Sequence, residues 1–440
     1  MPDTKLPLVA LDDDPTGAQL VNRARICVDL AAAAVRRAAA DGVASVHLLT
    51  NARALTPTAA YAKVLAAAGA ARAALPSAPL VIRGDSTLRG HLLEEYSAVR
   101  DACFGGRPVP LLLAPALPSA GRVTVAGTHL LERDGARVPL SETDYARDPD
   151  LGYTTSRLLD WAEQRSQGFF AAGEGREIGL DALRGGSGEE AIVAAARELV
   201  AGGRPGVIVP DAIEFADLER IGRAVLACHS RGIDLAVRCS PALVPAIADN
   251  LAPGPPQLDP VEDGVLVVCG SFVELTGRQL AALERAWPDR AVTVDPAALA
   301  SAEGEVWEGE SQRLLTAARR LLAAGGLAIL TTPRRRDRSL DGPARARLAE
   351  RLAEVCGRIE AGAVVAKGGI TSALTFSHGL GATLADVLGP LRPGVSVWRP
   401  LDGPRAGSTY VVVPGNVGDD RLLVDVVGAF INDRKENLDA

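Results

Sequence analysis

The sequence predicts an α/β protein with two domains, each a mainly parallel sheet flanked by helices. Three observations predict this fold class. Short apolar runs alternate with helix-like segments along the chain, which is typical of parallel sheets. The length of 440 residues exceeds one ordinary hydrophobic core. Residues 251–263 contain four prolines and are the best candidate for a linker. The expected domains are therefore residues 1–250 and 264–440.

The composition argues against several classes of protein. Hydrophobic residues make up 48% and charged residues 23% of the chain, and the formal net charge is −7. These values indicate a globular protein and argue against nucleic acid as a partner. We expect no signal peptide and no membrane span, because no apolar run reaches ~20 residues. The six cysteines form no C-x-x-C pair and the histidines no H-E-x-x-H motif, so we expect a reduced, cytoplasmic protein without a zinc site.

The first strand is expected at residues 6–11 and runs directly into Asp12, Asp13 and Asp14. Three carboxylates at a strand end repel one another unless a cation or a ligand compensates their charge. The segment therefore indicates a binding site, although a solvated acidic turn would also tolerate these charges.

The next elements repeat the pattern of a strand that ends in polar residues. A second strand at residues 25–30 and a helix to about residue 41 precede a third strand at 46–50. That strand ends at Asn51–Arg53, and Pro57 then opens a long helix at a position where proline is tolerated. Arg53 thus follows a buried strand, as the three aspartates do.

The turn after the fourth strand, at residues 80–82, is rich in functional groups. Its two guanidiniums, one carboxylate and two hydroxyls come from Arg83, Asp85, Ser86, Thr87 and Arg89. Ligands bind beyond the carboxyl ends of strands in an open α/β sheet, and Arg89 suits bidentate recognition of a carboxylate or phosphate. Taken alone, the turn fits a helix N-cap with surface arginines equally well.

A further strand at residues 109–113 leads into Pro115–Arg122, so four apolar runs end in polar or Pro/Gly-rich segments. In a parallel sheet these segments share one edge. The other elements expected in this domain are a hairpin over Asp134-Gly135 within residues 122–140, helices at 152–165 and 214–229, and strands at 207–209 and 235–237.

The second domain has three strand ends rich in Gly, Ser, Thr and Asn. Strands at 265–269, 362–366 and 410–413 lead into Gly270-Ser271, Lys367–Ser372 and Pro414–Gly418. Two glycines and a hydroxyl at a helix N-terminus suit an anion such as a nucleotide phosphate. No G-x-x-x-x-G-K-[ST] motif is present, so this is not a P-loop protein. Each loop alone is weak evidence, because glycine after a strand usually forms only a turn.

These motifs together resemble a known family. Asp13–Ala18 resembles the D-D-x-T-G-A opening of the four-carbon acid sugar kinases, which are ATP-dependent kinases acting on D-threonate, D-erythronate and 3-oxo-tetronates. Asp85–Gly90 matches the D-S-T-L-R-G signature of that family, and residues 115–122 look like its P-A-x-P-x-x-G-R segment. The resemblance runs from about residue 8 to about residue 428.

The resemblance implies a sugar-acid-binding N-terminal domain, a nucleotide-binding C-terminal domain and an active site in the interdomain cleft. By this resemblance the substrate would be bound by Asp13, Arg53, Asp85, Ser86, Thr87 and Arg89, and Asp14 and Arg83 are further candidates for the same site. ATP would be bound by Ser271, Gly368, Gly369, Ile370, Thr371 and Gly415, and Lys367 and Asn416 are further candidates there.

This chain departs from the common pattern of the family in several places. Pro15 stands where Leu or Phe is usual, and Arg83 stands where many members have Lys. Lys367–Ile370 replaces Ala-Gly-Gly-Asp, and Gly415–Gly418 replaces a Lys-Ser-Gly-x-Phe-Gly type of ending. These differences indicate a subgroup and leave the tetronate and its stereochemistry open.

The expected reaction is transfer of a phosphoryl group from ATP·Mg²⁺ to the terminal hydroxyl of a small sugar acid. Arg89 and Arg53, with Arg83 as a third candidate, would bind the carboxylate of the substrate. Asp13 is the first candidate for the base that accepts the hydroxyl proton, and Asp85 the second. The ligands of Mg²⁺ stay open between Asp12, Asp14 and phosphate oxygens. The oligomeric state also stays open, with a homodimer as one option.

Two other functions fit parts of the sequence. Asp12-x-Asp14-x-Thr16 resembles the nucleophile loop of haloacid-dehalogenase-type phosphatases, in which Asp12 would form an aspartyl-phosphate and Asp419-Asp420 would be the acidic pair. A non-catalytic sensor of sugar acids would need the arginines without the ATP loops. Neither alternative uses both the Asp85–Gly90 turn and the three loops of the second domain.

Overall fold

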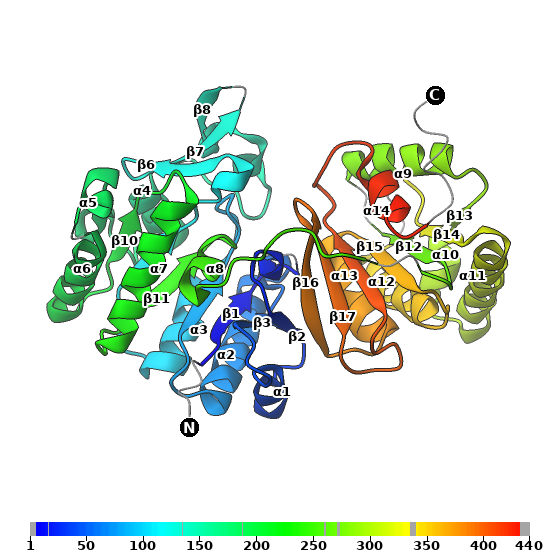
Figure 1. Cartoon of the computed structure of the whole chain (residues 1–440), viewed down its shortest axis with the longest axis horizontal. Coiled ribbons are helices and arrows are strands. Elements are labelled where there is room, and N and C mark those ends of the chain that lie inside the picture. The colour runs from blue at the N-terminus through cyan, green and yellow to red at the C-terminus, as the bar shows by residue number, and fades with distance from the viewer. Residues whose placement is uncertain are drawn as a thin grey trace. The chain divides into compact units, whose positions relative to one another are not determined.

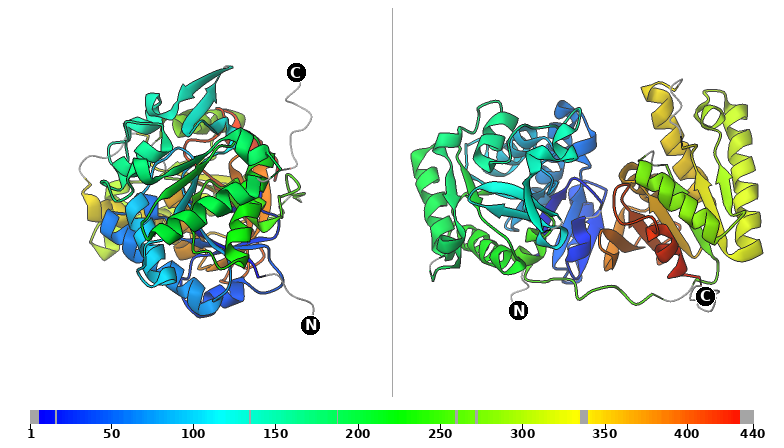
Figure 2. Two further views of the ribbon diagram at one scale, coloured as in Figure 1. Left: turned by 90° about the vertical axis from the view of Figure 1, so that its left-hand side faces the viewer. Right: turned by 90° about the horizontal axis from the view of Figure 1, so that it is seen from above.

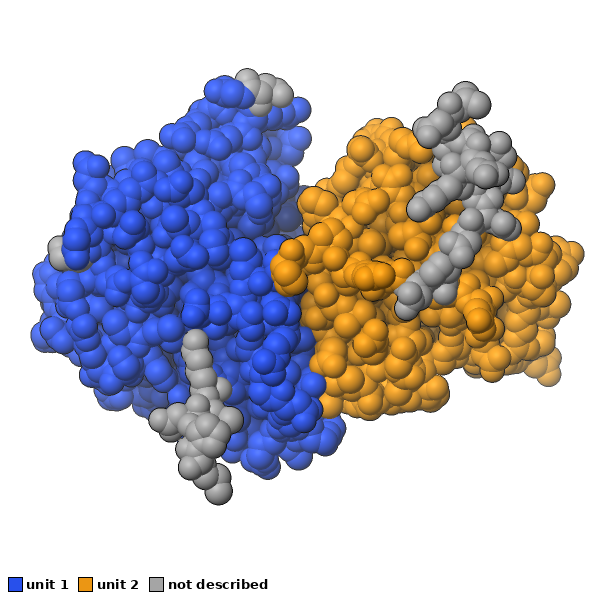
Figure 3. All heavy atoms as spheres, in the orientation of Figure 1, with its two compact units in different colours: residues 1–252 blue, residues 253–440 orange. Residues whose placement is uncertain are grey.

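The computed structural model describes residues 6–15, 17–133, 135–186, 188–258, 261–270, 273–334 and 340–431. It divides into two compact units, Met1–Ala252 and Pro253–Ala440, which Figure 3 shows in blue and orange. The division falls at the start of the proline-rich stretch that the sequence indicates as a linker. Each unit has its own set of strands and its own hydrophobic core. The chain is therefore α/β in both halves, as predicted.

The sheet of unit 1 is parallel, with the strand order β2-β3-β1-β4-β11-β5-β10-β9. Its strands are β1 (Leu8–Asp12), β2 (Ala24–Cys27), β3 (Ser45–Leu49), β4 (Leu80–Arg83), β5 (Leu111–Ala114), β9 (Arg176–Ile178), β10 (Val207–Pro210) and β11 (Ala236–Cys239). Most of their side chains are buried. Strands buried on both faces read as continuous apolar runs, which is why all of these strands except the partly exposed β9 were predicted from the sequence.

Helices connect and cover these strands (Figures 1 and 2). They are α1 (Ala32–Ala38), α2 (Pro57–Ala74), α3 (Leu92–Phe104), α4 (Leu158–Arg165), α5 (Leu180–Arg184), α6 (Gly188–Gly202), α7 (Phe215–Ser230) and α8 (Leu243–Ala248). Thr56 caps α2 by accepting a hydrogen bond from the backbone of Ala59, with Pro57 in the first turn. Tyr96 of α3 and Trp161 of α4 are fully buried in one core with Leu111 and Val209 of the sheet.

Residues 122–140 differ from the single predicted hairpin. They form three antiparallel strands, β6 (Arg122–Val125), β7 (Thr128–Arg133) and β8 (Ala136–Pro139), which extend from the body of unit 1 (Figures 1 and 2). Asp134 lies outside the described residues. The additional turn is Ala126-Gly127, where both residues have positive φ angles, 47° and 68°. Alanine seldom adopts this conformation, so the sequence carried no turn signal there.

The helix predicted at residues 152–165 begins only at Leu158. The residues before it are extended, because their backbone pairs with β7. The amide of His129 donates to the carbonyl of Ser156 at 2.8 Å, and Thr128 forms an antiparallel bridge with Arg157. A backbone that pairs with a strand cannot make the hydrogen bonds of a helix. The tertiary contact therefore overrides the helical pattern.

The sheet of unit 2 is mixed, with the strand order β13-β14-β12-β15-β18-β17-β16. Its parallel strands are β12 (Val265–Cys269), β13 (Ala291–Thr293), β14 (Leu327–Thr331), β15 (Ala363–Lys367) and β18 (Thr409–Val413). The antiparallel strands β16 (Leu384–Arg392) and β17 (Val395–Pro400) were missing from the sequence prediction.

The helices of unit 2 are α9 (Glu274–Ala286), α10 (Pro296–Ala300), α11 (Gly304–Gly325), α12 (Gly342–Gly357), α13 (Gly369–Leu374) and α14 (Leu422–Gly428). A π-helical turn, Thr375–Gly379, continues α13. Side chains of α9 and α14 pack with the sheet strands in one core. In the described part of the chain, every helix is too short or too polar to cross a bilayer.

Candidate active site

Three polar segments follow neighbouring strands of unit 1. Asp13 and Asp14 follow β1, Arg53 lies in the 3₁₀ turn Ala52–Ala54 after β3, and Asp85 lies in the turn after β4. Because β1 pairs in parallel with both β3 and β4, the three segments lie side by side at one edge of the sheet. The predicted grouping of these residues is therefore present in the structure.

Asp13 is a buried carboxylate between two arginines. Its oxygens lie 3.0 Å from Nη1 of Arg83 and 3.9 Å from Nε of Arg53. Within the described residues neither oxygen accepts a hydrogen bond of good geometry. Burial raises the pKa of Asp13 to about 7, against the opposing effect of the two guanidiniums. A carboxylate with a pKa near neutrality suits a general base.

Asp85 differs from Asp13 in its hydrogen bonds and in the direction of its pKa shift. It accepts hydrogen bonds from Nε of Arg89 at 2.8 Å and from the backbone amide and the hydroxyl of Thr87. Nη1 of Arg53 lies 3.2 Å from the same carboxylate. Although burial opposes ionisation, Arg53 and Arg89 hold the pKa of Asp85 well below its ordinary value. Asp85 therefore stays ionised and suits the orientation of a donor better than the acceptance of a proton.

Arg53 connects the three carboxylates at this edge. Besides its contacts with Asp13 and Asp85, its Nη2 donates to Asp14 at 2.5 Å. The side chain of Arg53 is 22% exposed. Arg53 thus relieves part of the repulsion that the sequence predicts for the acidic segment. This arrangement fixes the position of Asp13 relative to Asp85.

Arg83 and Asp12 form a buried pair beneath the site. Arg83 contacts Asp12, Asp13 and the backbone carbonyl of Asp14. A Cβ atom on Gly17 would overlap the guanidinium of Arg83, which explains the glycine in this segment. Because the guanidinium of Arg83 is occupied by oxygens of Asp12, Asp13 and Asp14, its setting favours positioning of Asp13 over direct contact with a ligand.

Asp12 has no exposed surface, and Nδ1 of His47 lies 2.8 Å from its carboxylate. A nucleophilic aspartate must reach its substrate. The contacts with His47 and Arg83 therefore do not suit the phosphatase alternative, in which Asp12 would attack a phosphate.

The turn after β4 has a strained centre. Leu88 has a φ angle of 66° and is fully buried in the core beside Leu92 and Tyr96. This conformation costs a non-glycine residue about 1–2 kcal/mol. Gly90, with a φ angle of 139°, has no room for a Cβ beside the buried guanidinium of Arg238. Packing of Leu88 and Arg238 therefore holds the turn in its shape.

Ser86 and Thr87 are both buried in this turn. The hydroxyl of Ser86 accepts a hydrogen bond from Nη1 of Arg122 at 2.9 Å. The guanidiniums of Arg89 and Arg122 lie 5.6 and 5.5 Å from the ring centre of Tyr145. Arg122 and Tyr145 were not among the predicted site residues. Arg122 ends the polar segment 115–122 that the sequence marks as a strand end, whereas nothing in the sequence distinguishes Tyr145.

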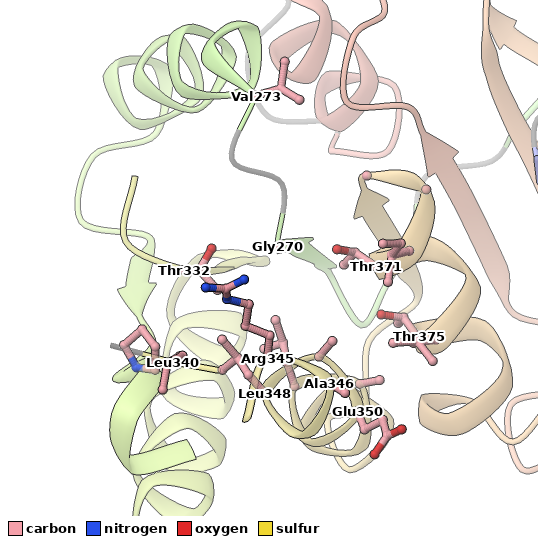
Figure 4. Close-up of a pocket in the computed structure, with 18 residues that line it drawn as sticks. Gly270, Val273, Thr332, Leu340, Arg345, Ala346, Leu348, Glu350, Thr371 and Thr375 are labelled. Carbon is pink, nitrogen blue, oxygen red and sulfur yellow. The ribbon is translucent and has the colours of Figure 1, made fainter. Parts of the chain in front are cut away.

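A cavity of about 600 Å³ lies beside the glycine-rich turn of unit 2. Gly270 and Gly368–Thr371 form part of its wall, so four of the predicted ATP-binding residues lie together there. Figure 4 shows Gly270 and Thr371 on one side and Arg345 and Leu348 of α12 on the other. Gly368 has a φ angle of 111°, which favours glycine. Ser271 lies outside the described residues.

The other predicted ATP-binding residues that the structure describes are Lys367, Gly415 and Asn416, and they are not part of this cavity wall. Lys367 is fully buried at the end of β15, and its Nζ donates to the carbonyl of Pro414 at 2.6 Å. Burial lowers the pKa of Lys367 to about 8. Lys367 is therefore not a solvated lysine. The carbonyl of Gly415 accepts from the hydroxyl of Thr276 at 3.1 Å. Neither Gly415 nor Asn416 lines the cavity.

Models of known protein families match both halves of the chain. Residues 8–247 match a model of a sugar-binding N-terminal domain, and residues 266–423 match a model of a nucleotide-binding C-terminal domain. The first model contains the Asp13, Arg53 and Asp85 cluster. The second contains the glycine-rich turn and its cavity.

Two curated relatives are kinases. A D-erythronate kinase of Heliobacterium modesticaldum is 32% identical over 259 residues, which is 58% of this chain and 53% of that protein. A D-threonate kinase of Salmonella typhimurium is 32% identical over 289 residues, which is 64% of this chain and 62% of that protein. The chain thus matches between half and two thirds of the length of these relatives.

Solved structures share the fold at lower identity. A protein of Salmonella typhimurium LT2 superposes with a TM-score of 0.69 at 19% identity, over 96% of this chain and 98% of that protein. A Haemophilus influenzae protein of the DUF1537 family superposes with a TM-score of 0.65 at 17% identity, over 96% of this chain and all of that protein. These likenesses concern the fold alone.

Proposed function

Because the chain belongs to the four-carbon acid sugar kinase family, we propose that it transfers a phosphoryl group from ATP to the terminal hydroxyl of a tetronate or 3-oxo-tetronate. The names of the two kinase relatives support this substrate class. The observation that carries the proposal is the setting of Asp13, a buried carboxylate with a pKa of about 7 beside an ionised Asp85.

In the proposed mechanism Asp13 accepts the proton of the attacking hydroxyl. A base with a pKa near the working pH is most effective in this role. Asp85 accepts a hydrogen bond from the substrate and orients it, while Arg53 holds both carboxylates in place. Phosphoryl transfer depends mainly on positioning and on neutralisation of charge. Ser86, Thr87, Arg89 and Asp14 complete the proposed substrate site.

ATP would bind in unit 2 at the cavity beside Gly368–Thr371, with Gly270 at the end of the neighbouring strand β12. Backbone amides of a glycine-rich turn can approach a phosphate closely. We retain Ser271, Lys367, Gly415 and Asn416 as proposed nucleotide residues, with Lys367 acting through the carbonyl of Pro414. That the reaction takes place in an interdomain cleft stays a prediction.

Mg²⁺ is proposed to enter with the nucleotide. Among the described residues no three histidine, cysteine or carboxylate side chains are placed to hold a metal ion together. Kinases bind Mg²⁺ through one or two carboxylates and the phosphates of the substrate. Asp14 is engaged with Arg53, so we assign no protein ligand and no separate step to the metal.

The test is a coupled assay of ADP release with ATP·Mg²⁺ and a panel of D- and L-threonate, D- and L-erythronate and their 3-oxo forms. Release that depends on one of these acids would establish the kinase and identify its substrate. Absence of release with every acid, from a protein that unfolds cooperatively, would overturn the proposal. Omission of ATP serves as the control.

A further inference from the structure

We propose that Arg122, together with the hydroxyl of Ser86, binds the carboxylate of the sugar acid and so selects acids as substrates. The inference rests on the proposed kinase function and concerns the same site. It differs from the expectation for Arg53, Arg83 and Arg89, because the structure assigns those three arginines to protein carboxylates.

The three predicted arginines are already paired. Arg53 contacts Asp13, Asp14 and Asp85, and Arg83 contacts Asp12 and Asp13. Arg89 donates to Asp85 at 2.8 Å and lies 3.7 Å from Asp148. A substrate carboxylate would have to compete with these anions for each guanidinium. The main effect of these three arginines is thus to fix the positions of the carboxylates in the site.

Arg122 differs because no described carboxylate forms an ion pair with it. Its Nη1 donates to the hydroxyl of Ser86 at 2.9 Å and its Nη2 to the hydroxyl of Tyr145 at 3.4 Å. Its Nε is buried and has no hydrogen-bond partner in the described residues. A guanidinium whose partners are all neutral has no counter-charge in the protein. Such a group favours an anion, above all a planar carboxylate that accepts two hydrogen bonds.

The backbone holds Arg122 in a fixed place. Its amide and carbonyl both pair with Leu117, at 3.1 and 2.8 Å. Gly121, with a φ angle of 66°, approaches the carbonyl of Glu132 so closely that a Cβ would not fit. The guanidinium is therefore presented from a rigid strand end, which lowers the entropy cost of binding a ligand.

The neighbouring His129 is neutral at physiological pH, so the positive charge at this place comes from Arg122. His129 is buried, and its Nε2 donates to the backbone carbonyl of Ser86 at 2.9 Å. Burial and the nearby Arg122 lower the pKa of His129 to about 4. A neutral His129 fixes the backbone of Ser86 at physiological pH without adding charge.

A chain of contacts connects Arg122 to the proposed base. Arg122 binds Ser86, Ser86 follows Asp85 in the turn, and Arg53 bridges Asp85 to Asp13. A four-carbon acid has its carboxylate at one end and its terminal hydroxyl at the other. Arg122 and Asp13 lie at the two ends of this chain of contacts. The arrangement suits a substrate whose acid end and reacting end are separated in this way.

The experiment measures kcat and KM for the preferred tetronate in Arg122→Met and Arg122→Lys. We expect the KM for the acid to rise about 100-fold in Arg122→Met, because a hydrogen-bonded charge pair is lost. The KM for ATP should stay unchanged, and Arg122→Lys should recover part of the affinity. Arg137→Met is the matched control, since Arg137 lies in the same small sheet and pairs with Glu132.

Chemical rescue gives a second readout. Added guanidinium ion should restore acid-dependent turnover of Arg122→Ala, whereas a purely structural role would instead lower the melting temperature. An unchanged KM for the acid in Arg122→Met, or equal losses for acid and ATP, would overturn the inference while leaving the kinase intact. Absence of turnover in the wild-type protein with every acid would instead overturn the proposed function.

Discussion

The two carboxylates of the site differ in pKa because their partners differ. Asp13 is buried, the side chain of Asp85 is 11% exposed, and both carboxylates contact Arg53. Asp85 also accepts three hydrogen bonds from Thr87 and Arg89, whereas Asp13 accepts none of good geometry within the described residues. Hydrogen bonds to the ionised form lower a pKa, and burial without them raises it. The same residue type thus serves two roles at neutral pH.

This difference predicts the pH dependence of the reaction. Asp13 must be ionised to accept a proton, and its pKa is about 7. With ATP·Mg²⁺ saturating, kcat/KM for the acid should therefore rise about tenfold per pH unit below this value and level off above it. The pKa of Asp85 lies far below this range, so ionisation of Asp85 should add no second inflection to the pH profile of kcat/KM. Steady-state kinetics between pH 5 and 9 provide the measurement, and a flat profile would remove Asp13 from the base role.

Replacement of Asp13 by Asn should lower kcat without lowering the stability of the fold. We expect kcat to fall by about 10²–10⁴-fold, because the base is lost. The raised pKa means that the folded state favours the neutral carboxyl group, so the contribution of Asp13 to stability declines as pH rises from 3.8 through about 7. Asn resembles the neutral form, and at pH 8 the melting temperature should be no lower than that of the wild type.

Asp144→Asn is the matched control for this variant, since Asp144 is exposed and pairs with Arg147 on the surface. Near-normal kcat in Asp13→Asn would show that another group accepts the proton. A large drop in melting temperature would mean that the ionised form stabilises the fold, contrary to the pKa.

At the residue scale, the sequence predicts which groups meet but not how each is paired. Asp13, Arg53 and Asp85 follow consecutive apolar strands, and a parallel sheet brings such strand ends together. The partner of each arginine depends on side-chain placement, which spacing does not encode. For that reason Arg83 was predicted as a ligand-binding residue although it lies buried between Asp12 and Asp13.

At the element scale, most strands that are continuous apolar runs were predicted, whereas the edge strands β9 and β13 and the antiparallel pair β16 and β17 were missed. β1, β12 and β15 are continuous apolar runs. β16 contains Asp386, Gly389 and Pro390, and its register with β17 is irregular. Glycine and proline usually indicate a loop, so only the antiparallel pairing with β17 reveals this strand.

The ends of β15 and β18 are tied by a buried lysine, which leads to a further prediction. Lys367 donates to the carbonyl of Pro414, where the loop after β18 begins. Its pKa of about 8 lies below the ordinary 10.5, so burial of the protonated lysine costs stability fully below pH 8, and this cost disappears as the pH rises from about 8 to 10.5. Lys367→Met removes both this cost and the tie to the loop.

We therefore expect Lys367→Met to have a melting temperature at pH 7 no lower than that of the wild type. The KM for ATP should rise several-fold, by the ~1 kcal/mol typical of one lost hydrogen bond, while the KM for the acid stays constant. Lys63→Met, which changes an exposed lysine of α2, is the control. An unchanged KM for ATP would show that the loop after β18 does not act on the nucleotide.

At the scale of the whole molecule, the two candidate sites lie in different units of the chain. Unit 1 contains the aspartate and arginine cluster, and unit 2 contains the glycine-rich turn with its cavity. Each unit has its own strands and its own core. Division of this kind is typical of domains that fold independently. The repeated strand and helix alternation made the two-domain fold visible in the sequence, whereas the sequence alone did not locate the end of unit 1 to the residue.

The last prediction concerns that end. The backbone of Ala252 donates to the carbonyl of Leu20 at 2.8 Å, and Val21 forms an antiparallel bridge with Leu251. A fragment of residues 1–252 should therefore unfold cooperatively and bind the preferred tetronate, as measured by calorimetry, without releasing ADP. A fragment of residues 1–250 lacks these backbone contacts and should melt several degrees lower, since about 1 kcal/mol of stability corresponds to a few degrees in a domain of this size. Equal melting temperatures would show that the bridge adds nothing, and a 1–252 fragment that does not fold would show that unit 1 depends on unit 2.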